Sequence, residues 1–115
     1  MTKQYMKEFP YFDNGTTFDA LLDQLSPMGF IDVSYKNDIS PSIMLPDKYS
    51  LSAITVWVDY KDRALREWPE TIADIFVEIT DPEHQFDGFN EDFTSVSDAL
   101  TYVRMHYMEL ELEND

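Results

Sequence analysis

The chain has 115 residues, no cysteine and a formal net charge of −15. This length supports one domain with a modest core, and the lack of cysteine excludes disulfides, a thiol nucleophile and thiolate zinc sites. A content of 43% hydrophobic and 15% aromatic residues is typical of a folded protein rather than a disordered acidic tail. No segment has the roughly 18–20 apolar residues that a membrane span needs, so the sequence predicts a soluble, cytoplasmic protein.

The negative charge is concentrated in the C-terminal part of the chain. Residues 1–66 contain nine acids and seven bases, whereas residues 67–115 contain fourteen acids and one base, Arg104. At a net charge this far from zero, the acidic side chains repel one another. Such a charge favours a cationic partner and disfavours direct binding to nucleic acid or to an anionic membrane. A merely solvated acidic surface is the simpler alternative, but the asymmetry favours a partner.

Two helices are predicted, near 17–26 and 95–108. Both segments carry apolar residues spaced to fall on one helical face, and Thr16 and Ser95 are the expected N-caps. Ser26-Pro27 and Gly29 end the first helix. Residues 1–15, which are rich in aromatic side chains, are expected to form an irregular arm, and residues 109–115 a flexible acidic tail.

Three strands are predicted, at 30–35, 53–60 and 72–80, because apolar and polar residues alternate there. The segment 36–52, with two prolines, is expected to be a loop that includes at most a short edge strand at 43–45. The connections lack the helical pattern of crossovers, so the strands should be antiparallel. The predicted fold is therefore a two-layer α-β-β-β-α domain of the α+β class, in which a three-stranded antiparallel sheet carries two helices on one face.

The expected core lies between this sheet face and the helices, and the other face is expected to be open. Trp57 and Phe76 are the candidate anchors of the open face, and the aromatic arm could instead fold over them; both alternatives remain. Its expected carboxylates are Asp32, Asp59, Asp74 and Glu78. The predicted core residues are Leu21, Leu25, Val56, Val58, Val77, Leu100 and Val103.

After the third strand, Asp81-Pro82 begins a segment that contains five acids and three phenylalanines but no Lys or Arg through Phe93. We interpret it as an acidic loop beside the open face, a surface suited to a positively charged partner. The candidate partner-binding residues of the face and the loop are Trp57, Asp74, Phe76, Glu78, Asp81, Glu83, Asp87, Phe89, Glu91 and Asp92.

No pattern in the sequence indicates catalysis, a cofactor or a metal. The stretch Glu83-x-Gln85-x-Asp87-Gly88 is similar to part of a calcium loop, but its twelfth position is Thr94 rather than a bidentate Glu. The chain has only three glycines and no phosphate-binding loop, and no pair of carboxylates is singled out by its spacing. We therefore expect a non-enzymatic protein without cofactor or dedicated metal site.

The predicted element order resembles that of the double-stranded RNA-binding domain. That family binds phosphates with lysines at the start of its last helix, where this chain has Ser95-Val96-Ser97-Asp98. Because the last 49 residues contain a single base, RNA binding is not expected.

In its small size, acidity, aromatic content and lack of cysteine, the chain resembles phage-encoded inhibitors of host defence nucleases, the anti-CRISPR and anti-restriction proteins. This resemblance is compositional and involves no motif. It implies an inhibitor whose carboxylates mimic nucleic-acid phosphates and occupy the basic groove of a defence nuclease in the host cytoplasm. The alternative is an acidic protein–protein interaction module, or an accessory or immunity subunit of a basic partner, that acts without mimicry.

Overall fold

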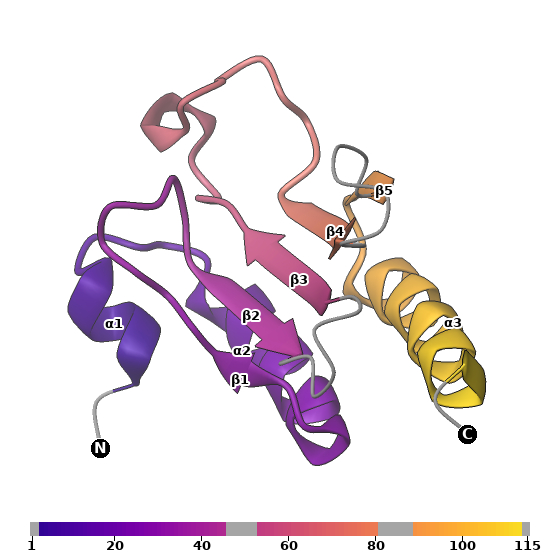
Figure 1. Ribbon diagram of the computed structural model, residues 1–115. Helices are drawn as coiled ribbons and strands as arrows, with labels where there is room; N and C mark the ends of the chain where they lie inside the picture. Colours follow the sequence, from indigo (N-terminus) through magenta and orange to yellow (C-terminus); the bar gives the residue numbers. More distant parts are fainter. Residues whose placement is uncertain (1–2, 46–52, 81–88, 114–115) are drawn as a thin grey trace.

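The computed structural model describes residues 3–45, 53–80 and 89–113, and these form an α+β fold built on one five-stranded sheet. Every strand pairs antiparallel with its neighbour in the chain, in the order β1-β2-β3-β4-β5 (Figure 1). The α+β class and the antiparallel pairing are confirmed, whereas a three-stranded sheet was wrong. The elements are α1 (Gln4–Glu8), α2 (Gly15–Leu25), the 3-10 helix η1 (Ser26–Met28), β1 (Ile31–Asp32), β2 (Ser42–Leu45), β3 (Ala53–Val58), the 3-10 helix η2 (Arg63–Leu65), β4 (Ile75–Thr80), β5 (Phe89–Phe93) and α3 (Val96–Glu113).

The core lies between the sheet and the helices α2 and α3, which pack on the same face (Figure 1). Alternate residues of β3 and β4 point into it, because successive side chains of a strand face opposite sides. All seven predicted core residues are buried, at 7% exposure or less. The central residues of the core are Phe18, Leu21, Leu25, Ile43, Ile54, Val56, Val58, Ile75, Val77, Ala99, Leu100 and Val103.

Helix α2 confirms the first predicted helix but not its predicted N-cap. The helix begins at Gly15, with Asn14 rather than Thr16 in the N-cap position. A Cβ atom on Gly15 would lie 2.9 Å from the hydroxyl of Tyr5, so glycine allows the N-terminal segment to approach the helix closely. Gly29 ends η1 with φ 101°, a left-handed conformation that favours glycine.

Helix α3 confirms the second predicted helix and its cap. The Ser95 hydroxyl accepts a hydrogen bond from the Asp98 backbone N–H at 3.3 Å. The helix continues to Glu113, five residues beyond the predicted end near 108. The physical reason is local: these residues are Glu and Leu, both good helix formers.

Strands β1 and β2 correct the prediction for residues 30–52. Strand β1 has two residues instead of six, because the Asp32 carboxylate accepts the Ser34 backbone N–H at 3.0 Å and the chain leaves the ladder there. Strand β2 is not an edge strand, since it pairs with β1 on one side and β3 on the other. Pro41 directly precedes it, so the ring of this proline does not interrupt the ladder.

Strand β5 replaces the C-terminal end of the predicted acidic loop. Phe89–Phe93 pair with β4 at the edge of the sheet. Strand β3 ends at Val58 rather than at the predicted residue 60, and β4 begins at Ile75 rather than at the predicted residue 72. Glu91 and Asp92 are exposed, whereas the ring of Phe93 packs against the core, with its centroid 5.4 Å from that of Tyr102. An edge strand tolerates acidic residues because its outer side faces water.

The N-terminal segment does not cover Trp57 and Phe76. It contains the short helix α1, which corrects the expected irregular arm, and the ring of Tyr5 lies 4.4 Å from that of Phe18 on α2. Phe12 packs edge-on against the same two rings. The arm therefore extends the core on the helical side of the sheet and leaves Trp57 and Phe76 partly exposed on the opposite face, hereafter the open face.

Candidate functional site

A row of side chains crosses the open face from β3 to β5. Trp57 on β3 pairs with Phe76 on β4, and Phe76 pairs with Asp92 on β5. Their neighbours Val56 and Val77 point to the core, so the period of two places these three residues on the other side. Trp57 and Phe76 are half-buried, and Asp92 is exposed.

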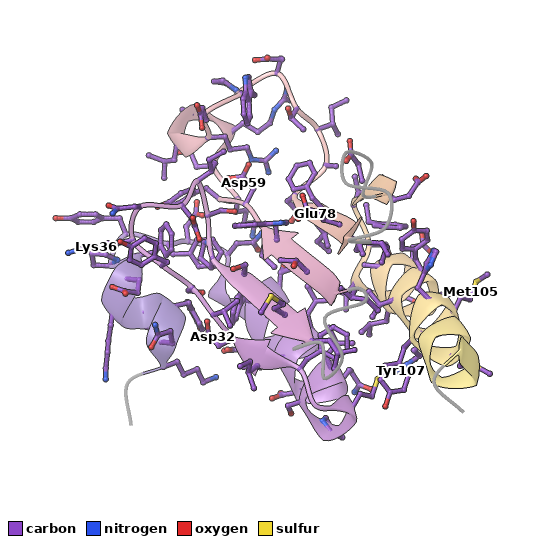
Figure 2. All side chains as sticks on the ribbon, in the orientation of Figure 1. Asp32, Lys36, Asp59, Glu78, Met105 and Tyr107 are labelled. Carbon is purple, nitrogen blue, oxygen red and sulfur yellow. The ribbon has the colours of Figure 1, made fainter. Side chains whose placement is uncertain are left out.

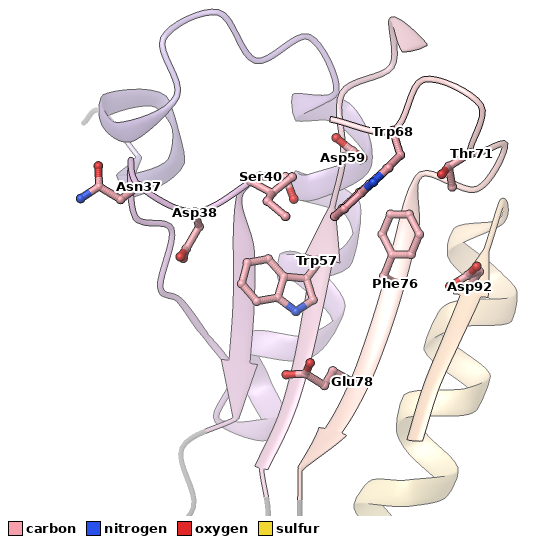
Figure 3. A pocket seen from close by; sticks show the side chains of 11 residues that line it. Asn37, Asp38, Ser40, Trp57, Asp59, Trp68, Thr71, Phe76, Glu78 and Asp92 are labelled. Atoms are coloured by element: carbon pink, nitrogen blue, oxygen red, sulfur yellow. The ribbon is translucent and has the colours of Figure 1, made fainter. Parts of the chain in front are cut away.

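The row forms the floor of a cleft of about 550 Å³ that opens on this face (Figure 3). Its walls come from two connections, residues 37–40 between β1 and β2 and residues 68–71 between β3 and β4. A cavity of this size is within the range of ligand-binding pockets. The residues that line it are Asn37, Asp38, Ile39, Ser40, Trp57, Asp59, Trp68, Thr71, Phe76, Glu78 and Asp92.

Arg66 stabilises the connection between β3 and β4 that carries Trp68. The residue is only 7% exposed, and its guanidinium donates to the backbone carbonyls of Tyr60, Thr71 and Ala73, at 2.7, 2.6 and 3.2 Å. The two ends of the connection are thereby tied together. Trp68 remains 54% exposed at the edge of the cleft, an unusual position for so large an apolar side chain.

The opposite wall is shaped by short-range hydrogen bonds. The Asp38 backbone N–H donates to the Tyr35 carbonyl at 2.9 Å, and the side-chain amide of Asn37 donates to the Tyr35 hydroxyl at 2.9 Å. Val58 donates its backbone N–H to the Pro41 carbonyl, which fixes the end of this wall to β3. Ile39 is left 47% exposed beside the cleft.

Four carboxylates line the cleft, from Asp38, Asp59, Glu78 and Asp92. In Figure 3 they surround the rings of Trp57 and Phe76: Asp38 and Asp92 lie on either side, Asp59 lies above and Glu78 below. The described residues that line the cleft include neither Lys nor Arg. The cleft is therefore an aromatic floor within a ring of negative charge.

Asp59 differs from the other three carboxylates because it is only 6% exposed. Its Oδ1 accepts the backbone N–H of Tyr60 at 2.8 Å. Burial raises the pKa of the Asp59 carboxyl above its usual value of 3.8, although the Tyr60 N–H and the charge of Arg66 act in the opposite direction. Removal from water thus outweighs local stabilisation of the charged form.

Four of the ten predicted partner-binding residues line the cleft: Trp57, Phe76, Glu78 and Asp92. Asp74 does not, because its Oδ2 accepts the side-chain amide of Asn14 at 2.9 Å and joins the start of α2 to the sheet. Asp32, also expected on the open face, accepts the backbone N–H of Tyr5 at 3.0 Å and holds α1. Both carboxylates therefore stabilise contacts within the fold.

Only the C-terminal part of the predicted acidic loop, Phe89–Phe93 on β5, belongs to the described residues. Glu91 is exposed and pairs with Val77, in the register of core-facing residues, so it is not on the side of Asp92. Phe89 is described only as a backbone partner of Ile79. Asp81, Glu83 and Asp87, and with them the calcium-like stretch, lie outside the described residues.

Sequence reasoning did not identify the cleft residues that lie on connections. Asp38, Ile39, Trp68 and Thr71 belong to no periodic pattern, and their approach to the strands depends on how two loops fold. The available signal was an isolated tryptophan, Trp68, in an otherwise polar connection. Asp59 was expected on the open face but was not among the partner-binding candidates.

The described residues contain no group of three or more His, Cys, Asp or Glu side chains placed to hold a metal ion. Among them, no helix is both long enough and apolar enough to span a bilayer. Comparisons of the chain with protein-family models, with curated proteins and with solved structures found no match.

Proposed function

We propose that this chain is a non-enzymatic acidic inhibitor that binds a basic, nucleic-acid-binding protein, with a defence nuclease of the CRISPR or restriction type as the target. The observation that carries the proposal is the cleft of the open face. Its aromatic floor supplies buried contact area, and its four carboxylates supply charge that matches a Lys- and Arg-lined groove. No residue of this arrangement needs to perform chemistry.

The electrostatics support such a partner. A net charge of −15 on 115 residues attracts a basic surface over long distances and accelerates association at low salt. DNA presents one charge per ~1.7 Å of its axis, so carboxylates spread over neighbouring strands can match part of a surface that evolved to bind phosphates. The same charge disfavours contact with nucleic acid itself.

The aromatic side chains give this attraction a specific location. Trp57, Phe76 and Trp68 lie within one cleft, and tryptophan is among the residues enriched at binding hot spots. Charge alone would favour any basic protein, whereas a shaped aromatic surface selects one. The partner surface should therefore combine positive charge with a protruding group that fits the cleft.

A second candidate function is an acidic interaction module that does not compete with nucleic acid. The observation that favours it is that several carboxylates, including Asp13, Asp32 and Asp74, accept hydrogen bonds within the fold. These groups are less available to imitate a phosphate backbone. Under this alternative, the aromatic cleft would bind the partner outside its nucleic-acid groove.

A pull-down from a host lysate, followed by competition with nucleic acid, tests the proposal. The captured protein should bind DNA or RNA, and this chain should displace that nucleic acid without binding or cleaving it. Glu78→Lys/Asp92→Lys should slow association and speed dissociation, because both charges line the cleft. The matched control, Asp23→Lys/Glu91→Lys, makes the same change of net charge away from the cleft and should alter mainly the association rate.

Two outcomes would count against the proposal. If the partner keeps its nucleic acid while bound to this chain, the interaction module replaces the inhibitor. If the control pair raises the dissociation rate as much as the cleft pair, the open face is not the binding surface.

A further inference from the structure

The floor of the cleft offers aromatic faces to a ligand. Trp57 and Phe76 are cross-strand partners, and both are half-buried on the open face. Trp68 adds a third aromatic ring from the connection between β3 and β4 (Figure 3). The negative face of an aromatic ring attracts cations, with tryptophan the strongest and a guanidinium the most frequent partner.

Asp59 is the most buried of the four carboxylates that line the cleft, at 6% exposure. Its Oδ1 accepts the Tyr60 backbone N–H, and because no buried side-chain oxygen of the described residues lacks a partner, the unbonded Oδ2 is in contact with solvent. Arg66 does not satisfy it, since that guanidinium donates to three backbone carbonyls and the described residues contain one ion pair, Lys3–Asp19. This oxygen is therefore available to accept a hydrogen bond from a donor that enters the cleft.

The arrangement of rings and carboxylates fits the shape of one group in particular. A guanidinium is planar: its faces are weakly hydrated and stack on aromatic rings, while its five N–H groups point outward in the plane. The cleft has rings at its floor and carboxylates around them, from Asp38, Asp59, Glu78 and Asp92 (Figure 3). An ammonium, which is compact and strongly hydrated, would use less of this surface.

We infer that the cleft is the receptor for a single arginine side chain that the partner protein inserts between Trp57, Phe76 and the surrounding carboxylates. This inference rests on the proposed function, because it names the group through which the basic partner is recognised. The arginine belongs to a protein rather than to a free metabolite. The exposed apolar side chains of Ile39 and Trp68 beside the cleft provide area for the residues next to that arginine.

Intrinsic fluorescence can test the inference, because the two tryptophans of the chain, Trp57 and Trp68, both line the cleft. The probe is the blocked peptide Gly-Ser-Arg-Ser-Gly, titrated at physiological salt. Its matched controls carry citrulline, which is neutral and has nearly the same shape, or lysine in place of arginine. The arginine peptide should change tryptophan emission in a saturable way, with the citrulline peptide binding at least roughly tenfold more weakly and the lysine peptide in between.

Substitutions in the protein locate the binding. Glu78→Gln/Asp59→Asn should weaken the arginine peptide by roughly tenfold or more. The control Asp23→Asn/Glu91→Gln removes the same charge elsewhere and should leave its affinity within about twofold. Circular dichroism confirms that both variants are folded. Equal binding of arginine and citrulline peptides, equal binding of arginine and lysine peptides, or equal effects of the two double variants would overturn the inference.

The peptide titration and the partner competition separate the two proposals. If the arginine peptide leaves the emission unchanged while a captured basic partner still loses its nucleic acid, the arginine receptor is wrong and the inhibitor stands. If the peptide binds with the expected preference but no nucleic acid is displaced from any partner, the receptor stands and the inhibitor fails.

Discussion

The two faces of the sheet are built from the same strands but differ in what they contact. On the helical side, Val56 and Val77 are fully buried between β3, β4 and the helices. On the open side, their neighbours Trp57 and Phe76 are half-buried and form the floor of the cleft. One strand thus stabilises the fold with one set of alternate residues and presents a binding surface with the other.

The carboxylates divide in the same way. Asp13, Asp32 and Asp74 accept hydrogen bonds that join loops and helices to the sheet. The side chains of Glu78 and Asp92 accept none within the described part of the chain (Figure 2 labels Glu78 on the open face). Negative charge alone therefore does not identify the binding surface; the hydrogen bonds that a carboxylate already makes decide its role.

The largest effect should come from the helical face. Leu21→Ala removes a fully buried side chain from the core and should lower the free energy of unfolding by about 2–5 kcal/mol, because a cavity remains between α2 and the sheet. Leu65→Ala, at a residue 52% exposed, should change it by less than about 0.5 kcal/mol. Urea unfolding measures both, and similar losses from the two variants would show that the core is misplaced.

The next effect concerns the wall of the cleft. Arg66→Met keeps the apolar stem but removes three hydrogen bonds to backbone carbonyls, and should cost about 2–3 kcal/mol of unfolding free energy. Arg63→Met also loses contacts with two carbonyls, but in water, and should cost less than about 1 kcal/mol. Chemical denaturation gives the difference. A harmless Arg66→Met would mean that the connection carrying Trp68 holds its shape by other means.

A smaller effect separates the two classes of carboxylate. Asp74→Ala leaves the buried amide of Asn14 with one acceptor fewer and should cost about 1 kcal/mol. Asp92→Ala removes the same charge from an exposed site and should stay within about 0.5 kcal/mol of the parent. Thermal unfolding at pH 7 compares them directly. Equal losses of stability in the two variants would show that Asp74 contributes no more to the fold than the cleft carboxylate Asp92.

The smallest expected effect is a gain in stability rather than a loss. Because the pKa of Asp59 is raised in the folded state, that state binds a proton more readily than the unfolded state, and ionisation of Asp59 costs stability above this pKa. Asp59→Asn should therefore raise the melting temperature slightly at pH 7, and the gain should shrink as the pH falls towards the ordinary value of 3.8. A lower melting temperature at pH 7 would show that the charge is paired.

Much of the fold could be predicted from the sequence because periodicity directly reports which face of an element is apolar. The spacing of Phe18, Leu21 and Leu25 predicted α2, and the alternation around Val56 and Val77 predicted β3 and β4 and the faces of the sheet. Strand β5 was missed because its sequence, Phe-Asn-Glu-Asp-Phe, carries three polar residues in a row. At an edge, pairing with β4 supplies the stabilisation that propensity does not.

It follows from the sequence alone that the chain is acidic, that its charge lies mostly after residue 66, and that Trp57 and Phe76 share the face opposite the core. Composition and period-two alternation are properties of the chain alone, so no contact is needed to read them. Tertiary contacts, in contrast, set which carboxylates remain available and bring Asp38 and Trp68 to the strand residues around one cleft. Those outcomes depend on hydrogen bonds between residues far apart in the chain, such as Asn14 to Asp74, and local sequence patterns do not encode them.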